Sequence, residues 1–66
     1  MKAELGPRER ELVVGLASSR TMKEIAFEWG RSLKTVEWYR ASIYRKLGIR
    51  DLQALTRYAM RRKMVK

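Results

Sequence analysis

The fold is decided by residues 21–48, TMKEIAFEWGRSLKTVEWYRASIYRKLG, in which signals for two helices flank one short turn. Thr21 and Glu24 have the spacing of a capping box, in which the hydroxyl and the carboxylate each bond a free backbone N–H at the helix start. Gly30 is a suitable end for this helix, because glycine adopts the left-handed conformation without strain. The pattern predicts a helix of about two turns over residues 21–29.

A longer helix is expected after this turn. Ser32 is a good N-cap, because its hydroxyl can accept a bond from a free N–H, and Gly48 is a suitable stop. Apolar residues recur at spacings of three and four, which places them on one face of a helix over residues 32–47. These residues are Val36, Tyr39, Ile43 and Leu47. A short helix, a tight glycine-containing turn and a longer helix are typical of a helix-turn-helix.

Two further helices flank this motif. Pro7 favours a helix over residues 7–18, because its missing N–H would be unpaired at the first helical position in any case. Asp51 is a good N-cap for a last helix over residues 51–63. The expected apolar face of the first helix consists of Leu12, Val13, Leu16 and Ala17. The expected apolar face of the last helix consists of Leu52, Leu55 and Ala59. The sequence predicts an all-α, four-helix single domain over residues 1–66.

Composition limits the function. The chain carries 16 lysine and arginine residues against 7 aspartate and glutamate residues, a formal charge of +9. In so short a chain this charge favours polyanionic partners such as nucleic acid. The absence of cysteine and histidine removes disulfides, thiolate nucleophiles, zinc ligation and the commonest general base. We therefore expect no enzymatic activity, no cofactor and no metal ion.

The sequence also bears on location. Neither a signal peptide nor an apolar run of membrane-spanning length is evident, so we expect a cytoplasmic protein. The basic segment from Arg57 to Lys66, with its interspersed Met and Val residues, is compatible with an anionic membrane surface. Binding to a membrane surface does not explain the capped helices that precede this segment. We therefore expect no membrane partner.

The longer helix places a second set of residues opposite its apolar face. At about 100° per residue, this outward stripe consists of Lys34, Trp38, Ala41 and Arg45. In a helix-turn-helix this helix enters the major groove, where cations hold phosphates and the first turns reach base edges. An outward Trp38 is costly to leave in water. We expect it to contact a thymine methyl or another apolar surface, unless it is a core or dimer residue.

Four sequence blocks follow one another at characteristic spacings. They are LGPREREL (5–12), KEIA (23–26), SLKTV (32–36) and KLGI (46–49). Together they resemble the LuxR/FixJ/GerE family of DNA-binding domains, over nearly the whole chain. The resemblance implies a four-helix domain whose third helix reads double-stranded DNA, and a role in bacterial transcription control. It also implies a homodimer formed through the fourth helix.

The resemblance assigns roles to individual positions. Those that match phosphate contacts in the family are Thr21, Lys23, Lys34, Thr35 and Lys46. Those that match base-reading positions are Glu37, Trp38 and Ala41. Val36 matches a position that packs within the domain and can also contact the DNA groove. Arg40 and Arg45, on the same helix, complete the candidate DNA-binding set.

The fourth helix carries the candidate dimer contact. An edge beside its core stripe consists of Gln53, Arg57, Met60 and Met64. The resemblance implies that two copies of the chain meet along this helix. A solvated face is the alternative interpretation of the same residues.

The chain departs from the family pattern at several positions. Arg31 replaces a usual apolar residue, Tyr39 a usual His and Ser42 a usual Asn. The carboxylate of Glu37 repels phosphate unless it accepts a bond from a cytosine amino group or pairs with Arg40. These departures leave open an alternative in which the outward face meets a protein. The chain is then a small module that pairs with or sequesters a full-length regulator, or contacts RNA polymerase.

Overall fold

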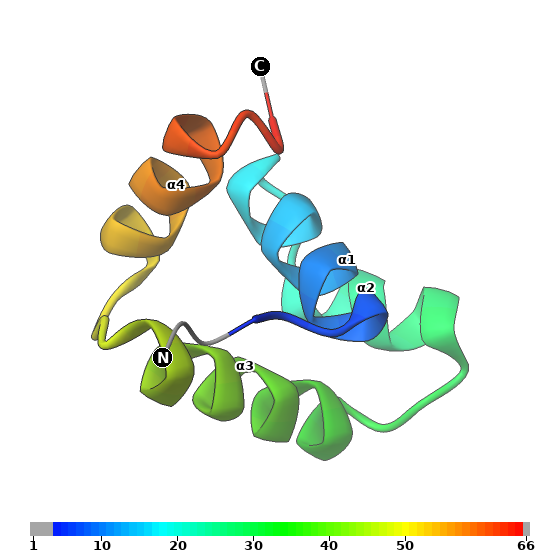
Figure 1. The fold of residues 1–66 in the computed structure, drawn as a ribbon. Coiled ribbons are helices and arrows are strands. Elements are labelled where there is room, and N and C mark those ends of the chain that lie inside the picture. The colour runs from blue at the N-terminus through cyan, green and yellow to red at the C-terminus, as the bar shows by residue number, and fades with distance from the viewer. Residues whose placement is uncertain (1–3, 66) are drawn as a thin grey trace.

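Four helices form the regular structure of residues 4–65, the part of the chain that this computed structural model describes (Figure 1). Their bounds are Pro7–Ala17 for α1, Met22–Trp29 for α2, Leu33–Leu47 for α3 and Leu52–Arg61 for α4. The predicted all-α class with four helices is confirmed, and the described range contains no strand. None of these helices is both long and apolar enough to cross a lipid bilayer.

Side chains at the predicted N-caps bond free N–H groups at the starts of three helices. The Thr21 hydroxyl accepts a bond from the N–H of Glu24 at 3.1 Å, and the Glu24 carboxylate accepts one from the N–H of Thr21 at 2.8 Å. The Ser32 hydroxyl and the Asp51 carboxylate cap α3 and α4, over 3.2 and 2.8 Å. A cap of this kind typically contributes about 1 kcal/mol. The starts of α2, α3 and α4 therefore follow from the sequence.

Each helix is followed by one residue in the left-handed conformation. Gly30 and Gly48 have φ values of 65° and 66°, at which glycine is unstrained. Ser19 and Lys63 take the same conformation, with φ values of 71° and 58°. In all four cases the next residue donates its N–H to the carbonyl five residues back, which closes the helix.

This ending corrects the predicted span of the last helix. α4 stops at Arg61 rather than at residue 63, because Lys63 turns the chain back. The N–H of Met64 then bonds the carbonyl of Ala59 at 2.8 Å, and Met64 packs against the core. α1 likewise ends at Ala17, one residue before the predicted end. Both stops lack the glycine that makes such an ending recognisable in a sequence.

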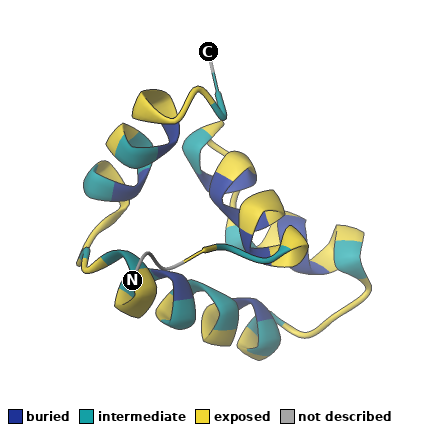
Figure 2. Cartoon of the chain, viewed as in Figure 1, coloured by how far each residue is buried: buried dark blue, intermediate teal, exposed yellow. Residues whose placement is uncertain are grey.

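α1 is the central helix of the domain, because it packs against each of the other three helices. α2 also packs against α3. In Figure 1, α1 lies between α4 and α2. The buried positions turn toward the interior of this arrangement (Figure 2). The core consists of Leu12, Val13, Leu16, Ile25, Ala26, Val36, Ile43, Leu55 and Ala59. The predicted inward position of Leu52 is wrong, since this residue is 49% exposed in the first turn of α4.

Gly15 allows α1 and α2 to approach closely. A Cβ atom at this position would lie 2.9 Å from Cδ1 of Ile25, which is closer than real contacts allow. Glycine inside a helix costs about 1 kcal/mol relative to alanine. The lack of a side chain at Gly15 thus lowers the intrinsic stability of α1 and leaves room for the Ile25 side chain of α2 against the α1 backbone.

Candidate nucleic-acid interface

The outer face of α3 carries exposed side chains opposite its buried face. Val36 and Ile43, on the inner face, are fully buried. The exposed residues on the opposite face are Lys34, Trp38, Ala41 and Arg45. Trp38 is 63% exposed, so its indole lies on the surface of the domain and not in the core. The structure therefore brings the predicted stripe together on one face of one helix, which we call the outer stripe.

Arg40 lies apart from the outer stripe, on a flank of α3 near the start of α2. Its guanidinium carbon is 5.7 Å from the ring centre of Tyr44. Both residues line a surface pocket together with Thr21 and Met22. Lys23 is exposed in the same first turn of α2. The candidate contacts thus fall into two groups, one on the outer stripe and one beside the start of α2.

Two other polar residues of α3 lie next to the outer stripe. Thr35 is half-buried, and its hydroxyl oxygen lies 3.1 Å from that of the Ser32 cap. Glu37 is exposed. The ion pairs among residues 4–65 do not include a pair between Glu37 and Arg40. In this structure the carboxylate of Glu37 is therefore open to a base or to solvent.

Val36 is removed from the candidate contacts by its burial. Its side chain is completely enclosed by the core. It shares the inner face of α3 with Ile43, so a DNA surface cannot reach it without unpacking the helix. The expectation that Val36 contacts the DNA groove is therefore wrong for this structure. Its observed role is to hold α3 on the domain.

A buried carboxylate ties α1 to α3. Glu9 is the buried charged residue of the described range. It accepts hydrogen bonds from the Lys46 ammonium and the Gly6 N–H, both at 2.8 Å, and from the Ser42 hydroxyl at 3.3 Å. Burial raises the pKa of Glu9, but these bonds and the charge of Lys46 outweigh that effect and hold the pKa below its ordinary value. The charged form of Glu9 is therefore stabilised by folding.

This cluster gives Lys46 and Ser42 a structural role. Lys46 matches a DNA-backbone contact of the family, yet its ammonium is already paired with Glu9. Ser42 donates to the same carboxylate. The sequence pattern alone does not predict the cluster, because Glu9 suits the first turn of a helix by itself. The available signal was its position three and four residues before Leu12 and Val13, on the apolar face of α1.

Phe27 is a surface residue outside the predicted DNA-binding and dimer positions. It is 88% exposed on α2. The buried residues of that helix are Ile25 and Ala26, and Phe27 points away from both. Because phenylalanine is enriched at contacts between proteins, Phe27 is a candidate contact for a protein partner. Its position opposite the apolar face of α2 could be recognised from the helical repeat alone.

The outer face of α4 exposes both apolar and polar side chains. Gln53 and Arg57 are exposed, and Met60 is 55% exposed. Leu52 lies beside them in a shallow groove of about 380 Å³. Met64 does not belong to this face, because it follows the end of α4 and packs against the core. The candidate dimer edge is therefore reduced to Gln53, Arg57 and Met60, of which Met60 is the exposed apolar residue.

The order of α2, a three-residue turn and α3 is that of a helix-turn-helix. A family model described as "Bacterial regulatory proteins, luxR family" matches residues 3–59, which is most of the chain. The chain belongs to this LuxR family. The family inferred from the four sequence blocks is thereby confirmed, and it is a family of regulatory proteins and not of enzymes.

Individual regulators are similar to the chain over the same region. The transcriptional regulatory protein FixJ of Bradyrhizobium diazoefficiens is 41% identical over 63 residues, which are 96% of this chain and 31% of that protein. The probable HTH-type transcriptional regulator GfsR of Streptomyces halstedii is 47% identical over 82% of this chain and 23% of its own length. The transcriptional regulatory protein UhpA of Escherichia coli is 43% identical over 80% of this chain and 27% of its own length.

The chain therefore spans less than a third of the length of these regulators. No solved structure matches it at a significant level.

The Glu9 cluster predicts a specific dependence of stability on pH. Glu9→Gln imitates the protonated carboxyl group, and we expect it to lower the free energy of unfolding by about 1–2 kcal/mol at pH 7. The folded-state pKa of Glu9 is lowered, so its contribution is fully present above the ordinary value of 4.5 and is lost as the pH falls through the folded-state pKa. Urea unfolding of both proteins from pH 7 into acid should show the two stabilities converging.

Glu37→Gln is the matched control, since Glu37 is exposed and its replacement should change stability by less than about 0.5 kcal/mol. A difference between wild type and Glu9→Gln that stays constant down to acid pH would contradict this account of the cluster.

Proposed function

We propose that this chain binds the major groove of double-stranded DNA through α3 and serves in bacterial transcription regulation. The observation that carries the proposal is the outer stripe, which is exposed on the second helix of a helix-turn-helix and lies opposite its buried face. Membership of the LuxR family and the formal charge of +9 support it. FixJ, GfsR and UhpA are named as transcriptional regulators, and we extend that function to this chain. Such a function assigns the chain to the bacterial cytoplasm.

Phosphate contacts would come from both groups of residues. Lys34 and Arg45 bear the cations of the outer stripe, one near each end of α3. Thr21, Lys23 and Arg40 lie near or in the first turn of α2, the helix that crosses the DNA backbone in this motif. Contacts of this kind fix the orientation of the protein on DNA and carry no sequence information directly. Lys46 and Thr35 contribute less, because both already bond within the domain.

Base reading would come from the middle of the outer stripe and its edge. Trp38 offers a large apolar surface suited to the methyl group of thymine, and Ala41 one turn later lets the helix approach the base edges. Glu37 is free of ion pairs with the described residues and is therefore available to accept a hydrogen bond from the amino group of cytosine. Trp38 is thus the residue that we expect to contribute most to sequence preference.

The proposal predicts different effects for Lys34→Ala and Trp38→Ala. Loss of a phosphate contact should weaken binding to every duplex by about three- to tenfold, since phosphates are the same in all sequences. Loss of the Trp38 ring should reduce the preference for duplexes selected by the wild type from a random pool, by about 1 kcal/mol or more. Fluorescence anisotropy titrations of selected and scrambled duplexes with both variants measure the two effects.

Arg62→Ala, at the end of α4, and Tyr58→Ala, within α4, are matched controls for the lost cation and the lost aromatic ring. Both should leave affinity and preference close to wild type. Equal losses on every duplex for Lys34→Ala and Trp38→Ala would refute the division of roles.

The proposed functional unit is a homodimer formed through α4. The outer face of α4 carries four exposed residues, which are Leu52, Gln53, Arg57 and Met60. In a two-fold symmetric dimer the contact is formed by the same surface patch of both copies. The apolar Met60 would then lie near the two-fold axis. Each copy would then read one half-site of the DNA.

Met60→Asp should therefore abolish the dimer, because two carboxylates would be brought together at the centre of the contact. Sedimentation equilibrium over a concentration series measures the effect, with and without a duplex that carries two half-sites. Phe27→Asp introduces the same charge at an exposed apolar residue on α2 and should leave the dimer intact. Dissociation by Phe27→Asp together with an unaffected Met60→Asp would place self-association on α2 and overturn the proposed edge.

A second candidate function is favoured by the exposure of Phe27 and Trp38. In this alternative the chain pairs with a full-length transcription regulator, or contacts RNA polymerase, without binding DNA itself. Exposed aromatic rings are enriched in such protein contacts. Absence of duplex binding, combined with a stable complex between the chain and a purified full-length regulator, would select this function.

A further inference from the structure

Three aromatic rings form a continuous row from α2 to the outer stripe. The rings of Trp29 and Tyr39 have centres 5.4 Å apart and meet at 83°. The rings of Tyr39 and Trp38 have centres 5.2 Å apart and meet at 85°. Both pairs have the edge-to-face geometry that aromatic rings prefer. Tyr39 is thus in contact with one ring on each side.

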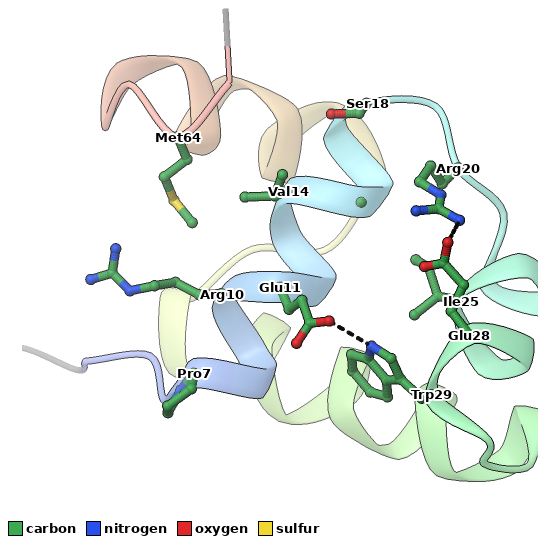
Figure 3. Close-up of a pocket in the computed structure, with 11 residues that line it drawn as sticks. Pro7, Arg10, Glu11, Val14, Ser18, Arg20, Ile25, Glu28, Trp29 and Met64 are labelled. Atoms are coloured by element: carbon green, nitrogen blue, oxygen red, sulfur yellow. Dashed lines mark hydrogen bonds and ion pairs between the residues drawn. The ribbon is translucent and has the colours of Figure 1, made fainter.

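The far end of this row is fixed by the first turns of α1. The indole N–H of Trp29 donates a hydrogen bond to the Glu11 carboxylate at 3.2 Å (Figure 3). The guanidinium carbon of Arg8 lies 4.9 Å from the centre of the Trp29 ring, within the range of a cation–π contact. Arg8 and Glu11 also form an ion pair at 3.5 Å. Trp29 is therefore held by α1 through both its N–H and its ring face.

The contact with Tyr39 determines the direction in which Trp38 leans. Adjacent residues on a helix are about 100° apart and do not face one another. Contact between the rings therefore requires the Trp38 indole to lean sideways toward Tyr39, and not to stand out along the middle of the outer stripe. Because Trp38 is 63% exposed, few other contacts are available to select this orientation.

We propose that Tyr39 is a positioning residue for DNA reading, which holds the Trp38 ring in one orientation with support from Trp29, Glu11 and Arg8 behind it. The inference rests on the proposed function, since it assumes that Trp38 reads bases. It adds that sequence preference depends on a residue that need not touch DNA. The ring of Tyr39 makes both contacts, so phenylalanine can replace it and an aliphatic residue cannot.

The test uses Tyr39→Leu and Tyr39→Phe in the free protein first. Near-ultraviolet circular dichroism reports the fixed environment of the rings. We expect Tyr39→Phe to retain most of the signal and Tyr39→Leu to lose the part that Trp38→Ala also loses. Far-ultraviolet spectra and thermal unfolding establish that each variant is folded. Tyr58→Leu is the matched control, because Tyr58 is a half-buried tyrosine on α4 with Arg62 over its ring.

The second measurement is the ratio of dissociation constants for scrambled and selected duplexes. Tyr39→Leu should reduce this ratio at least threefold and nearly as far as Trp38→Ala does, while binding to scrambled duplex changes less than twofold. Tyr39→Phe and Tyr58→Leu should stay within twofold of wild type. In the Trp38→Ala background Tyr39→Leu should have no further effect, because Tyr39 acts through Trp38.

Several results would overturn the proposal. One is full discrimination by a folded Tyr39→Leu variant, and another is an additional loss when this change is combined with Trp38→Ala. If Tyr39→Leu does not fold, Glu11→Ala tests the same row from its far end, and unchanged discrimination there contradicts the proposal. A wild type that selects no duplex removes the proposed function, whereas the spectra still decide whether Tyr39 fixes the orientation of Trp38.

Discussion

The ion pair between Glu9 and Lys46 is the interaction on which the position of α3 on the domain depends. Glu9 lies in the first turn of α1 and Lys46 in the last turn of α3. A buried carboxylate is costly unless its oxygens are bonded and its charge is paired, and Glu9 meets both requirements through Lys46, Ser42 and the Gly6 N–H. A packing of α3 on α1 that kept Glu9 buried but moved Lys46 away would leave this charge unpaired. The pair therefore favours the observed orientation of α3.

A second attachment holds the other half of α3. Glu11 and Arg8, one turn of α1 apart, fix Trp29, whose ring contacts Tyr39 near the middle of α3. α1 thus holds α3 at two separated points, one polar and one aromatic. Between them, the core residues Val36 and Ile43 fix its distance from the domain. In a chain of 66 residues with a small core, such attachments matter because few buried apolar contacts are available to define a helix orientation.

Features determined by local chemistry could be read from the sequence, and features determined by contacts between distant residues could not. The caps at Thr21, Ser32 and Asp51 and the outer stripe follow from spacing within one helix. Lys63 ends α4 without a glycine, which moved Met64 from the predicted dimer edge to the core. The partners of Glu9 are 33 and 37 residues away along the chain, so their pairing depends on the packing of α1 on α3. The role of Lys46 changed for the same reason, whereas the burial of Val36 follows from its predicted place on the apolar face of the helix.

The central claim is that the outer stripe and the start of α2 bind the phosphates of DNA. Its most direct test is titration of one duplex with this protein at two salt concentrations, followed by fluorescence anisotropy. About four to seven phosphate contacts would release as many counterions, so affinity should fall about tenfold or more between low and physiological salt. The fall should be smaller for Lys34→Ala, which lacks one of these contacts. An affinity that does not change with salt, or the absence of duplex binding at low salt, would contradict the account.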